Sequence, residues 1–306
     1  MPEANIPKPR VAVIGLGSMG FGMATSLRRA SFDVTGCDVS ADAVARFVAE
    51  GGKGAKTPAE AAQGAGIVVS VVLNAAQTET ILFGKDGVVE TLAKDAVFVS
   101  SATMDPEVAK RLAKQLEATG RHYLDAPISG GAQRAAQGEL TILASGSAAA
   151  FAKARPALDA MAAKLYELGD AAGQGAAFKM INQLLAGVHI AAASEAITFA
   201  ARQGLDLQKV YEVITASAGN SWMFENRMPH VIAGDYKPRS AVEIFVKDLG
   251  IVQDMARNAR FPATLASAAL QMFLMASASG MGRDDDASVA RLYGRISGTR
   301  LPGEPK

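Results

Sequence analysis

Short apolar runs alternate with alanine-rich segments through the first half of the chain. Residues 11–14 and 67–73 are unbroken apolar runs, the pattern of strands that are covered on both faces of a parallel sheet. Strand–helix alternation of this kind is typical of right-handed βαβ units. The pattern predicts helices up to about residue 30 and over 41–50, and strands at 11–14, 32–37, 67–73, 97–100, 122–125, 140–144 and 165–168.

The pattern changes after Gly173. From 175 to 301 the apolar positions follow helical spacing, and breaks near Asp206, Asn220 and Pro262 separate successive helices. We therefore expect an α/β domain with a parallel sheet over residues 1–172. An all-α domain is expected over residues 173–306, with a part in substrate binding and oligomerisation.

One apolar segment, residues 184–201, has the length of a membrane span. It contains His189, Ser194 and Glu195 and is dominated by alanine, which suits a helix buried between protein surfaces better than a bilayer span. Met1–Arg10 has charges and prolines before any apolar run, so no signal peptide is expected there. The sequence predicts a soluble, cytoplasmic protein with no membrane partner.

Composition and charge exclude several classes of function. With 49% hydrophobic and 20% charged residues the chain is expected to fold. Its formal net charge of +1, without a basic cluster, argues against a nucleic-acid partner. A single cysteine excludes a disulfide framework and a cysteine zinc site. Residues 284–286 are three consecutive aspartates without a metal-ligand pattern, so a solvated turn that caps the last helix is expected, and no metal.

A glycine-rich turn, Gly15-Leu16-Gly17-Ser18-Met19-Gly20, joins the first predicted strand to the first helix. The first glycine permits the tight turn, the second lets backbone amides approach a pyrophosphate, and the third allows close helix packing. The helix N-terminus adds unpaired N–H groups and a partial positive charge. The turn therefore predicts a Rossmann-type dinucleotide site.

Asp38 ends the second predicted strand, ~20 residues after the glycine turn. A carboxylate there accepts hydrogen bonds from a ribose 2′-hydroxyl and repels a 2′-phosphate. Val39 and Ser40 follow, where NADP sites often have an arginine, and Ser40 suits the cap of the next helix better than Asp38 does. NAD is the predicted cofactor, and Cys37 is expected to be a small buried strand residue.

Four blocks, Gly15–Ala24, Asp125–Gly131, Gly173–Lys179 and Phe245–Leu249, carry a family resemblance. Together they resemble the β-hydroxyacid dehydrogenase family, which includes 3-hydroxyisobutyrate dehydrogenase and tartronate semialdehyde reductase. The blocks occur in the family's order and span most of the chain. Residues 183–192 and 218–228 are similar to the L-threonate dehydrogenase branch, whose members oxidise a four-carbon sugar acid with NAD.

The resemblance implies that Lys179 is the general acid/base. Oxidation of a carbinol requires removal of the hydroxyl proton as hydride leaves carbon. A lysine does this when burial and neighbouring charge lower its pKa, and the apolar neighbours of Lys179 argue against exposure. His122, His189 and His230 match no catalytic position of the family and are expected to be structural.

The resemblance also implies where the substrate binds. The hydroxyl of Ser129 and backbone amides at Ser129, Gly130 and Gly131 are expected to hold the substrate carboxylate. Asn182 and Gln183, three and four residues after Lys179, share its helix face. Either amide is a candidate for the contact with the substrate hydroxyl. A common family pattern has asparagine where this chain has Gln183.

Further residues are expected near the cofactor or the substrate. Leu73 and Asn74 end the third predicted strand, where the nicotinamide ribose of family members lies, and Thr103 matches a position beside the nicotinamide. Lys247 resembles the family's second lysine, and Asp248 is expected either to pair with it or to be a solvated helix carboxylate. The expected cofactor contacts are Gly15, Leu16, Gly17, Ser18, Met19, Gly20, Asp38, Leu73, Asn74, Thr103 and Lys247.

The polar residues Asn182, Gln183, Asn220 and Ser221 are candidates for binding the outer hydroxyls of a sugar acid. Trp222 and Phe224 are expected to be packing residues. The leading hypothesis is an NAD-dependent dehydrogenase that converts L-threonate to its 2-oxo acid, as a homodimer or homotetramer. Tartronate semialdehyde and 3-hydroxyisobutyrate are the alternative substrates. A dinucleotide-binding scaffold without turnover is the alternative of a different class, and the presence of Lys179 disfavours it.

Overall fold

Residues 8–304 are described by the computed structural model, and they divide into two units, residues up to Lys179 and residues from Met180. Most of Met1–Arg10, for which no signal peptide was predicted, lies outside the described residues. Helix α8 (Gln174–Arg202) contains the division between the units. The sequence-based domain boundary, between residues 172 and 173, comes just before this helix.

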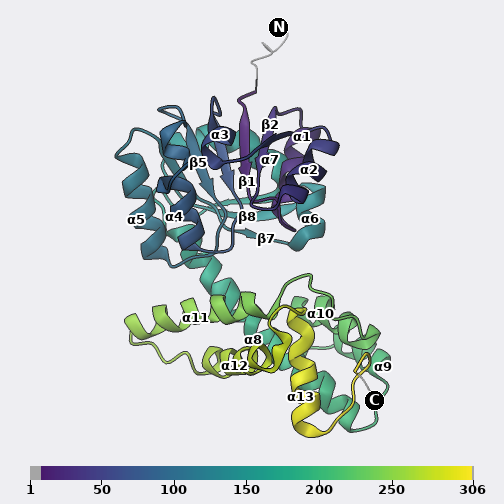
Figure 1. Ribbon diagram of the computed structural model, residues 1–306. Helices are drawn as coiled ribbons and strands as arrows, with labels where there is room; N and C mark the ends of the chain where they lie inside the picture. Colours follow the sequence, from purple (N-terminus) through teal and green to yellow (C-terminus); the bar gives the residue numbers. More distant parts are fainter. Residues whose placement is uncertain (1–7, 305–306) are drawn as a thin grey trace. The chain divides into compact units, whose positions relative to one another are not determined.

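Six parallel strands form the main sheet of the N-terminal unit, in the order β3-β2-β1-β4-β5-β6 (Figure 1). Because side chains alternate along a strand, Val11 and Val13 pack into one hydrophobic core and Ala12 and Ile14 into another. The predicted α/β fold of Rossmann type is confirmed. The strands are β1 (Val11–Ile14), β2 (Val34–Cys37), β3 (Lys53–Ala55), β4 (Ile67–Ser70), β5 (Val97–Ser100) and β6 (His122–Asp125).

Helices cover both faces of this sheet (Figure 1). Apolar residues of α1 (Gly20–Arg29), α2 (Ala41–Ala49) and α7 (Ala148–Met161) pack on one face. Those of α3 (Pro58–Ala62), α4 (Ala75–Phe83) and α5 (Pro106–Glu117), with the short helix η1 (Val88–Glu90), pack on the other. The apolar residues of the strands are therefore buried on both sides, as the unbroken apolar runs predicted.

A second, three-stranded sheet completes the N-terminal unit. Strand β7 (Ile128–Ser129) is antiparallel to β8 (Leu140–Ala144), which is parallel to β9 (Ala162–Glu167). Helix α6 (Gly131–Gln137) connects β7 to β8. The sequence predicted β8 and part of β9. It missed β3 and β7, which are 3 and 2 residues long and too short for a hydrophobic period to stand out.

The second unit is helical throughout its described part, as predicted. One hydrophobic core joins α8 to α11 and α12, and another joins α8 to α10 and α13. Asp206 caps α9, and Asn220 and Pro262 lie between helices, so the predicted breaks are confirmed. The helices are α9 (Leu207–Thr215), α10 (Trp222–Ala233), α11 (Val242–Asn258), α12 (Thr264–Ala276) and α13 (Val289–Ser297), with short turns η2 (Ser277–Met281) and η3 (Asp286–Ser288).

Two segments, Gln174–Arg202 and Thr264–Met281, are long and apolar enough to cross a membrane by length and composition alone. Half of the most apolar part of α8 is buried inside the protein. Residues of α8 contribute to both cores of the helical unit, which explains why its sequence is apolar on more than one side.

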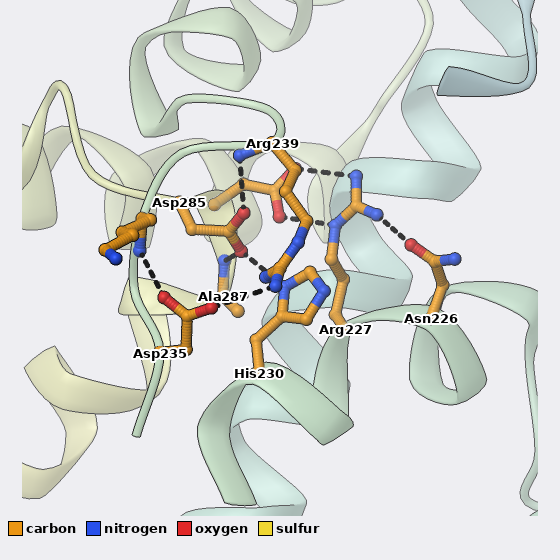
Figure 2. A network of polar contacts seen from close by, with 9 residues as sticks. Asn226, Arg227, His230, Asp235, Arg239, Asp285 and Ala287 are labelled. Atoms are coloured by element: carbon orange, nitrogen blue, oxygen red, sulfur yellow. Dashed lines mark hydrogen bonds and ion pairs between the residues drawn. The ribbon is translucent and has the colours of Figure 1, made fainter. Parts of the chain in front are cut away.

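The aspartates at 284–286 do not form the solvated turn that we predicted. Asp285 and Asp286 are fully buried. Arg227 of α10 donates to both carboxylate oxygens of Asp286, at 2.6 and 3.0 Å. His230 contacts Asp285 at 2.9 Å (Figure 2). Asp285 accepts a hydrogen bond from the N–H of Ala287 and so caps η3, the short turn before α13, whereas no side chain caps α13 itself, the last helix.

Arg227 and His230 lie more than 50 residues from these aspartates in sequence, which is why the local pattern suggested solvent instead. Of the two residues expected to pack in the core, Trp222 and Phe224, only Phe224 does so. Phe224 is buried and stacks on Tyr211, whereas Trp222 is half exposed.

Candidate active site

The glycine turn after β1 has the geometry of an anion site. Gly15 has φ +97°, and a Cβ there would lie 2.3 Å from the carbonyl oxygen of Val71, so only glycine fits. No side chain caps the N-terminus of α1, and its first N–H groups remain available to a phosphate. The neighbouring helices α2, α3, α4, α5 and α7 are capped by side chains, namely those of Ser40, Thr57, Asn74, Asp105 and Ser147.

Asp38 follows β2 directly and is joined to the glycine turn. Its carboxylate accepts hydrogen bonds from the N–H groups of Leu16, at 2.6 Å, and Ser40, at 2.8 Å. Ser40 itself caps α2, as expected, so Asp38 does not serve as that cap. A half-buried carboxylate with unused lone pairs beside the glycine turn fits the ribose of a dinucleotide.

Cys37, next to Asp38, has the environment of a structural residue. Its side chain is buried at the end of β2, and burial, with the charge of Asp38 as a smaller cause, raises the pKa of the thiol to about 11. A thiol with this pKa is protonated near neutral pH and is a poor nucleophile. The expectation of a small buried strand residue is confirmed.

Leu73 and Asn74 lie beyond the end of β4, which stops at Ser70 and not at Leu73 as predicted. The chain then enters α4, where the side chains of Asn74 and Gln77 accept hydrogen bonds from backbone N–H groups. Asn74 accepts from the N–H of Gln77 at 2.9 Å, and the Gln77 side chain accepts from the N–H of Leu73 at 2.9 Å. Leu73 is exposed and Asn74 is half-buried.

The expected cofactor residues of the N-terminal unit share one edge of the sheet. The glycine turn follows β1, Asp38 follows β2, Asn74 follows β4 and Thr103 follows β5. These strands are parallel, so all four positions lie at their carboxyl ends. Open α/β sheets bind nucleotides outside this edge, where the strand order changes direction between β1 and β4.

The predicted carboxylate loop lies between β7 and α6. Ser129 ends β7, and Gly130 and Gly131 have φ of +135° and +78°. Gly130 precedes the first residue of α6, and no side chain caps this helix. The loop therefore presents backbone N–H groups beside a serine hydroxyl, the donors that a carboxylate requires.

Lys179 lies in the second turn of α8, and only 7% of it is exposed. The prediction that it is buried is confirmed. Three and four residues further on, Asn182 is exposed and Gln183 is buried. The spacing places all three on one side of the helix.

A chain of polar contacts joins α8 to α11 within the helical unit. Asn182 donates to the side-chain oxygen of Gln183 at 2.9 Å, and Gln183 donates to Asp248. Lys247 pairs with the other carboxylate oxygen of Asp248, which is 1% exposed. Of the two expectations for Asp248, the pairing with Lys247 is confirmed and the solvated carboxylate is wrong.

Sequence reasoning gave no function to Asp125 and did not identify Ser145. Asp125, 1% exposed at the end of β6, accepts from the N–H groups of Gly173, at 2.9 Å, and Ala176, at 2.8 Å. Ser145 accepts from the N–H of Gly175 at 2.9 Å. No local signal marks these residues, because their partners at the start of α8 are 30 to 51 residues away in sequence.

The pKa of Asp125 has a consequence for stability. Burial raises it from 3.8 to about 6, and the hydrogen bonds from Ala176, Gly173 and Ser145 offset only part of that rise. The folded protein thus holds this proton more tightly than the unfolded chain. The contribution of Asp125 to the free energy of unfolding is present below about pH 4 and is lost as the pH rises through about 6.

Asp125→Asn lacks this titration. Between pH 4 and pH 7 its free energy of unfolding should therefore rise relative to the wild type by about 3 kcal/mol. Urea unfolding of both proteins, followed by circular dichroism across this pH range, measures the difference. A difference that does not change with pH would contradict the raised pKa.

Two family models match this chain, one in the α/β part and one in the helical part. Residues 10–169 match the NAD-binding domain of 6-phosphogluconate dehydrogenase, and residues 173–293 match the NAD-binding domain of NADP-dependent 3-hydroxyisobutyrate dehydrogenase. The L-threonate dehydrogenase of Cupriavidus necator is 50% identical over 294 residues, which cover 96% of this chain and 98% of that protein. The chain belongs to the β-hydroxyacid dehydrogenase family.

Two further relatives support this membership. The L-threonate dehydrogenase of Escherichia coli K12 is 47% identical over 96% of both chains. A crystal structure described as 3-hydroxyisobutyrate dehydrogenase from Salmonella typhimurium superposes with a TM-score of 0.89 at 49% identity, covering 93% of this chain and all of that one. Like other β-hydroxyacid dehydrogenases, this protein is an NAD-dependent hydroxyacid oxidoreductase. The predicted dinucleotide cofactor is confirmed, and the scaffold without turnover is disfavoured.

Proposed function

We propose that the protein oxidises L-threonate to its 2-oxo acid with NAD, and that Lys179 is the general base. The observation that carries the substrate assignment is the near-full-length similarity to L-threonate dehydrogenases. The buried Lys179 and the donor-rich loop at Ser129–Gly131 supply the groups that this chemistry needs. The name of the Salmonella structure makes 3-hydroxyisobutyrate the alternative substrate.

The roles of the residues follow from their chemistry. Backbone N–H groups and the hydroxyl of Ser129–Gly131 bind the carboxylate, which orients the adjacent C2 carbinol. Lys179, as the neutral amine, takes the proton of the C2 hydroxyl, and in the reverse direction its ammonium returns that proton to the carbonyl oxygen. NAD, when bound, supplies the acceptor for the hydride that leaves C2.

Asn182 is the amide that we assign to a substrate hydroxyl. Gln183 is buried, and it uses both ends of its amide for Asn182 and Asp248. Asn182 is exposed, and its side-chain oxygen is not used in that contact. Gln183 then holds Asn182 in place, and Asp248 holds both Gln183 and Lys247.

The preference for NAD over NADP should be at least about tenfold in kcat/KM, which corresponds to about 1.4 kcal/mol. The reason is that the carboxylate of Asp38 repels a 2′-phosphate and is a good acceptor for a 2′-hydroxyl. Initial rates with both cofactors measure the ratio. Asp38→Asn keeps an acceptor for the N–H of Leu16 but removes the charge, so the preference should shrink in this variant. Equal efficiency of the wild type with both cofactors would refute the assignment.

Substrate choice is measured by comparing L-threonate, 3-hydroxyisobutyrate and glycerate at matched concentrations, with NADH formation as the signal. We expect the highest kcat/KM with L-threonate, because a site that hydrogen-bonds the outer hydroxyls penalises substrates that lack them. A higher value for 3-hydroxyisobutyrate would reject the threonate assignment and leave the family unchanged.

The expected partners for the outer hydroxyls need revision in one respect. Asn220 donates to the carbonyl oxygen of Thr215 and to Glu225, and Ser221 caps α10. Both residues line a different feature, an apolar groove of about 830 Å³ between α8, α9 and α10. We therefore propose the C3 and C4 contacts around Asn182.

A homodimer or homotetramer is the proposed assembly. Exposed apolar side chains line the groove, among them Phe199, Leu205 and Val213, and this supports burial of the surface by a second copy. Light scattering after size exclusion measures the mass, and Phe199→Lys should lower it. We propose a cytoplasmic location, as expected for an enzyme that draws on the cellular NAD pool.

A further inference from the structure

The first turn of α8 is capped by residues that are distant in sequence. The N–H groups of Gly175 and Ala176 belong to the unpaired donors that every helix has at its N-terminus. Ser145 and Asp125 accept from them at 2.9 and 2.8 Å, and Asp125 also accepts from Gly173. Most helices obtain such a cap from the residue just before them. Here the cap comes from the ends of β6 and β8.

The capping residues are themselves held rigidly. Asp125 and Ser145 exchange two backbone hydrogen bonds, of 3.0 and 2.8 Å, so their side chains are fixed next to each other. The backbone of α8 lies directly on them. A Cβ at Gly175 would be 2.4 Å from the carbonyl oxygen of Leu143 and 2.9 Å from that of Asp125. These contacts therefore fix the distance of the first turn of α8 from β6 and β8, and they also fix the orientation of that turn about the helix axis.

This arrangement costs stability. Burial raises the pKa of the Asp125 carboxyl group to about 6, so the charged form that predominates at neutral pH is less stable in the folded protein than in the unfolded chain. Capping a helix does not require a buried charge. Neutral Ser, Thr and Asn side chains cap other helices of this unit. Lys179 follows Ala176 by 3 residues, which is less than one helical turn.

We propose that Asp125 and Ser145 are positioning residues that fix Lys179 for proton transfer through the first turn of α8. This inference rests on the proposed function of Lys179 as general base. Proton transfer requires the base within hydrogen-bond reach of the hydroxyl, and a displacement of about 1 Å costs on the order of 100-fold in rate. Loss of either cap frees the first turn to shift, and the displacement reaches Lys179 without altering the cofactor site.

The test compares kcat, the KM for NAD and the Kd for NAD in Asp125→Ala, Asp125→Asn and Ser145→Ala. We expect kcat to fall about 10- to 100-fold in Asp125→Ala and about 3- to 10-fold in Ser145→Ala, with the NAD constants within about twofold of the wild type. Asp125→Asn keeps an acceptor oxygen and should recover most of the kcat that Asp125→Ala loses. If these residues only stabilised the fold, their loss would not lower kcat while leaving the KM and Kd for NAD unchanged.

Ser147→Ala is the matched control. Ser147 is two residues from Ser145 and caps α7 through the N–H of Ala150 at 3.2 Å. Its loss should lower the midpoint of thermal unfolding to a similar extent as the loss of the Ser145 cap and leave kcat unchanged. If Asp125→Ala does not fold, Ser145→Ala against Ser147→Ala decides the question.

Lys179→Ala is measured alongside, so that two failures can be told apart. If Lys179→Ala retains turnover, the proposed function of Lys179 is wrong. If Lys179→Ala is inactive but Asp125→Ala and Ser145→Ala have the kcat of the wild type, the positioning inference alone is overturned. A parallel loss of kcat in Ser147→Ala would also overturn it, because it would show a general effect of lost caps.

Discussion

Lys179→Ala should lower kcat by roughly 10²- to 10⁴-fold, the usual effect of losing a positioned acid or base. The side chain is buried in α8, with an exposed amide donor, Asn182, three residues further on. Titration with NAD should be close to normal, because the glycine turn and Asp38 are unaltered. Single-turnover and steady-state rates with L-threonate, together with an NAD titration, measure both quantities.

Two further variants separate chemistry from packing. Lys179→Met keeps most of the aliphatic chain and should be as inactive as Lys179→Ala if the amine is what matters. Lys114→Ala removes an exposed lysine of α5 and should leave kcat unchanged. Turnover of Lys179→Ala within a few-fold of the wild type would show that Lys179 is not the base, and Lys247 would be the next residue to test.

Asp286→Ala should lower the free energy of unfolding of the helical unit by about 3–5 kcal/mol. Asp286 is fully buried and holds Arg227 through two hydrogen bonds, and burial alone would lower the pKa of that guanidinium. The charge of Asp286, its hydrogen bonds and the charge of Asp285 together outweigh burial and raise that pKa, so Arg227 stays cationic. Removing the carboxylate leaves an uncompensated buried charge, which is more costly than losing the pair's mutual attraction.

The chain contains a suitable probe and a suitable control for this measurement. Trp222, the single tryptophan, lies in α10, the helix that also carries Arg227, so its fluorescence during urea unfolding reports on the helical unit. Asp254→Ala breaks an ion pair with Arg257, 3.2 Å long, whose side chains are both largely exposed. It should cost less than about 1 kcal/mol. If Asp286→Ala costs no more than Asp254→Ala, the buried pair does not stabilise the unit.

Features that depend on neighbours in sequence were predictable. Strands β1, β5, β6 and β8 match the predicted strands residue for residue. β1 and β5 are buried along their whole length, and a strand covered on both faces has a distinctive composition. The glycine turn and Asp38 were also found, since a strand, three glycines and a helix follow one another within 20 residues. The end of β4 was missed because the apolar run continues to Leu73, next to the start of α4, where the side chains of Asn74 and Gln77 bind backbone N–H groups.

Features that depend on distant partners were not predictable. Asp125 and Ser145 are ordinary residues at strand ends until the fold places the first turn of α8 against them. Likewise, Asp285 and Asp286 read as a solvated turn until α10 supplies His230 and Arg227. In each case a charged or polar side chain is buried, and its partner comes from another element of the fold.

Hydride should leave C2 of L-threonate for NAD. L-threonate deuterated at C2, followed by mass spectrometry of the reduced cofactor, tests this transfer directly. We expect NADH that carries the deuterium, and a product without it. Unlabelled NADH together with a product that retains the deuterium at C2 would contradict the proposed reaction, because oxidation would then occur at another carbon.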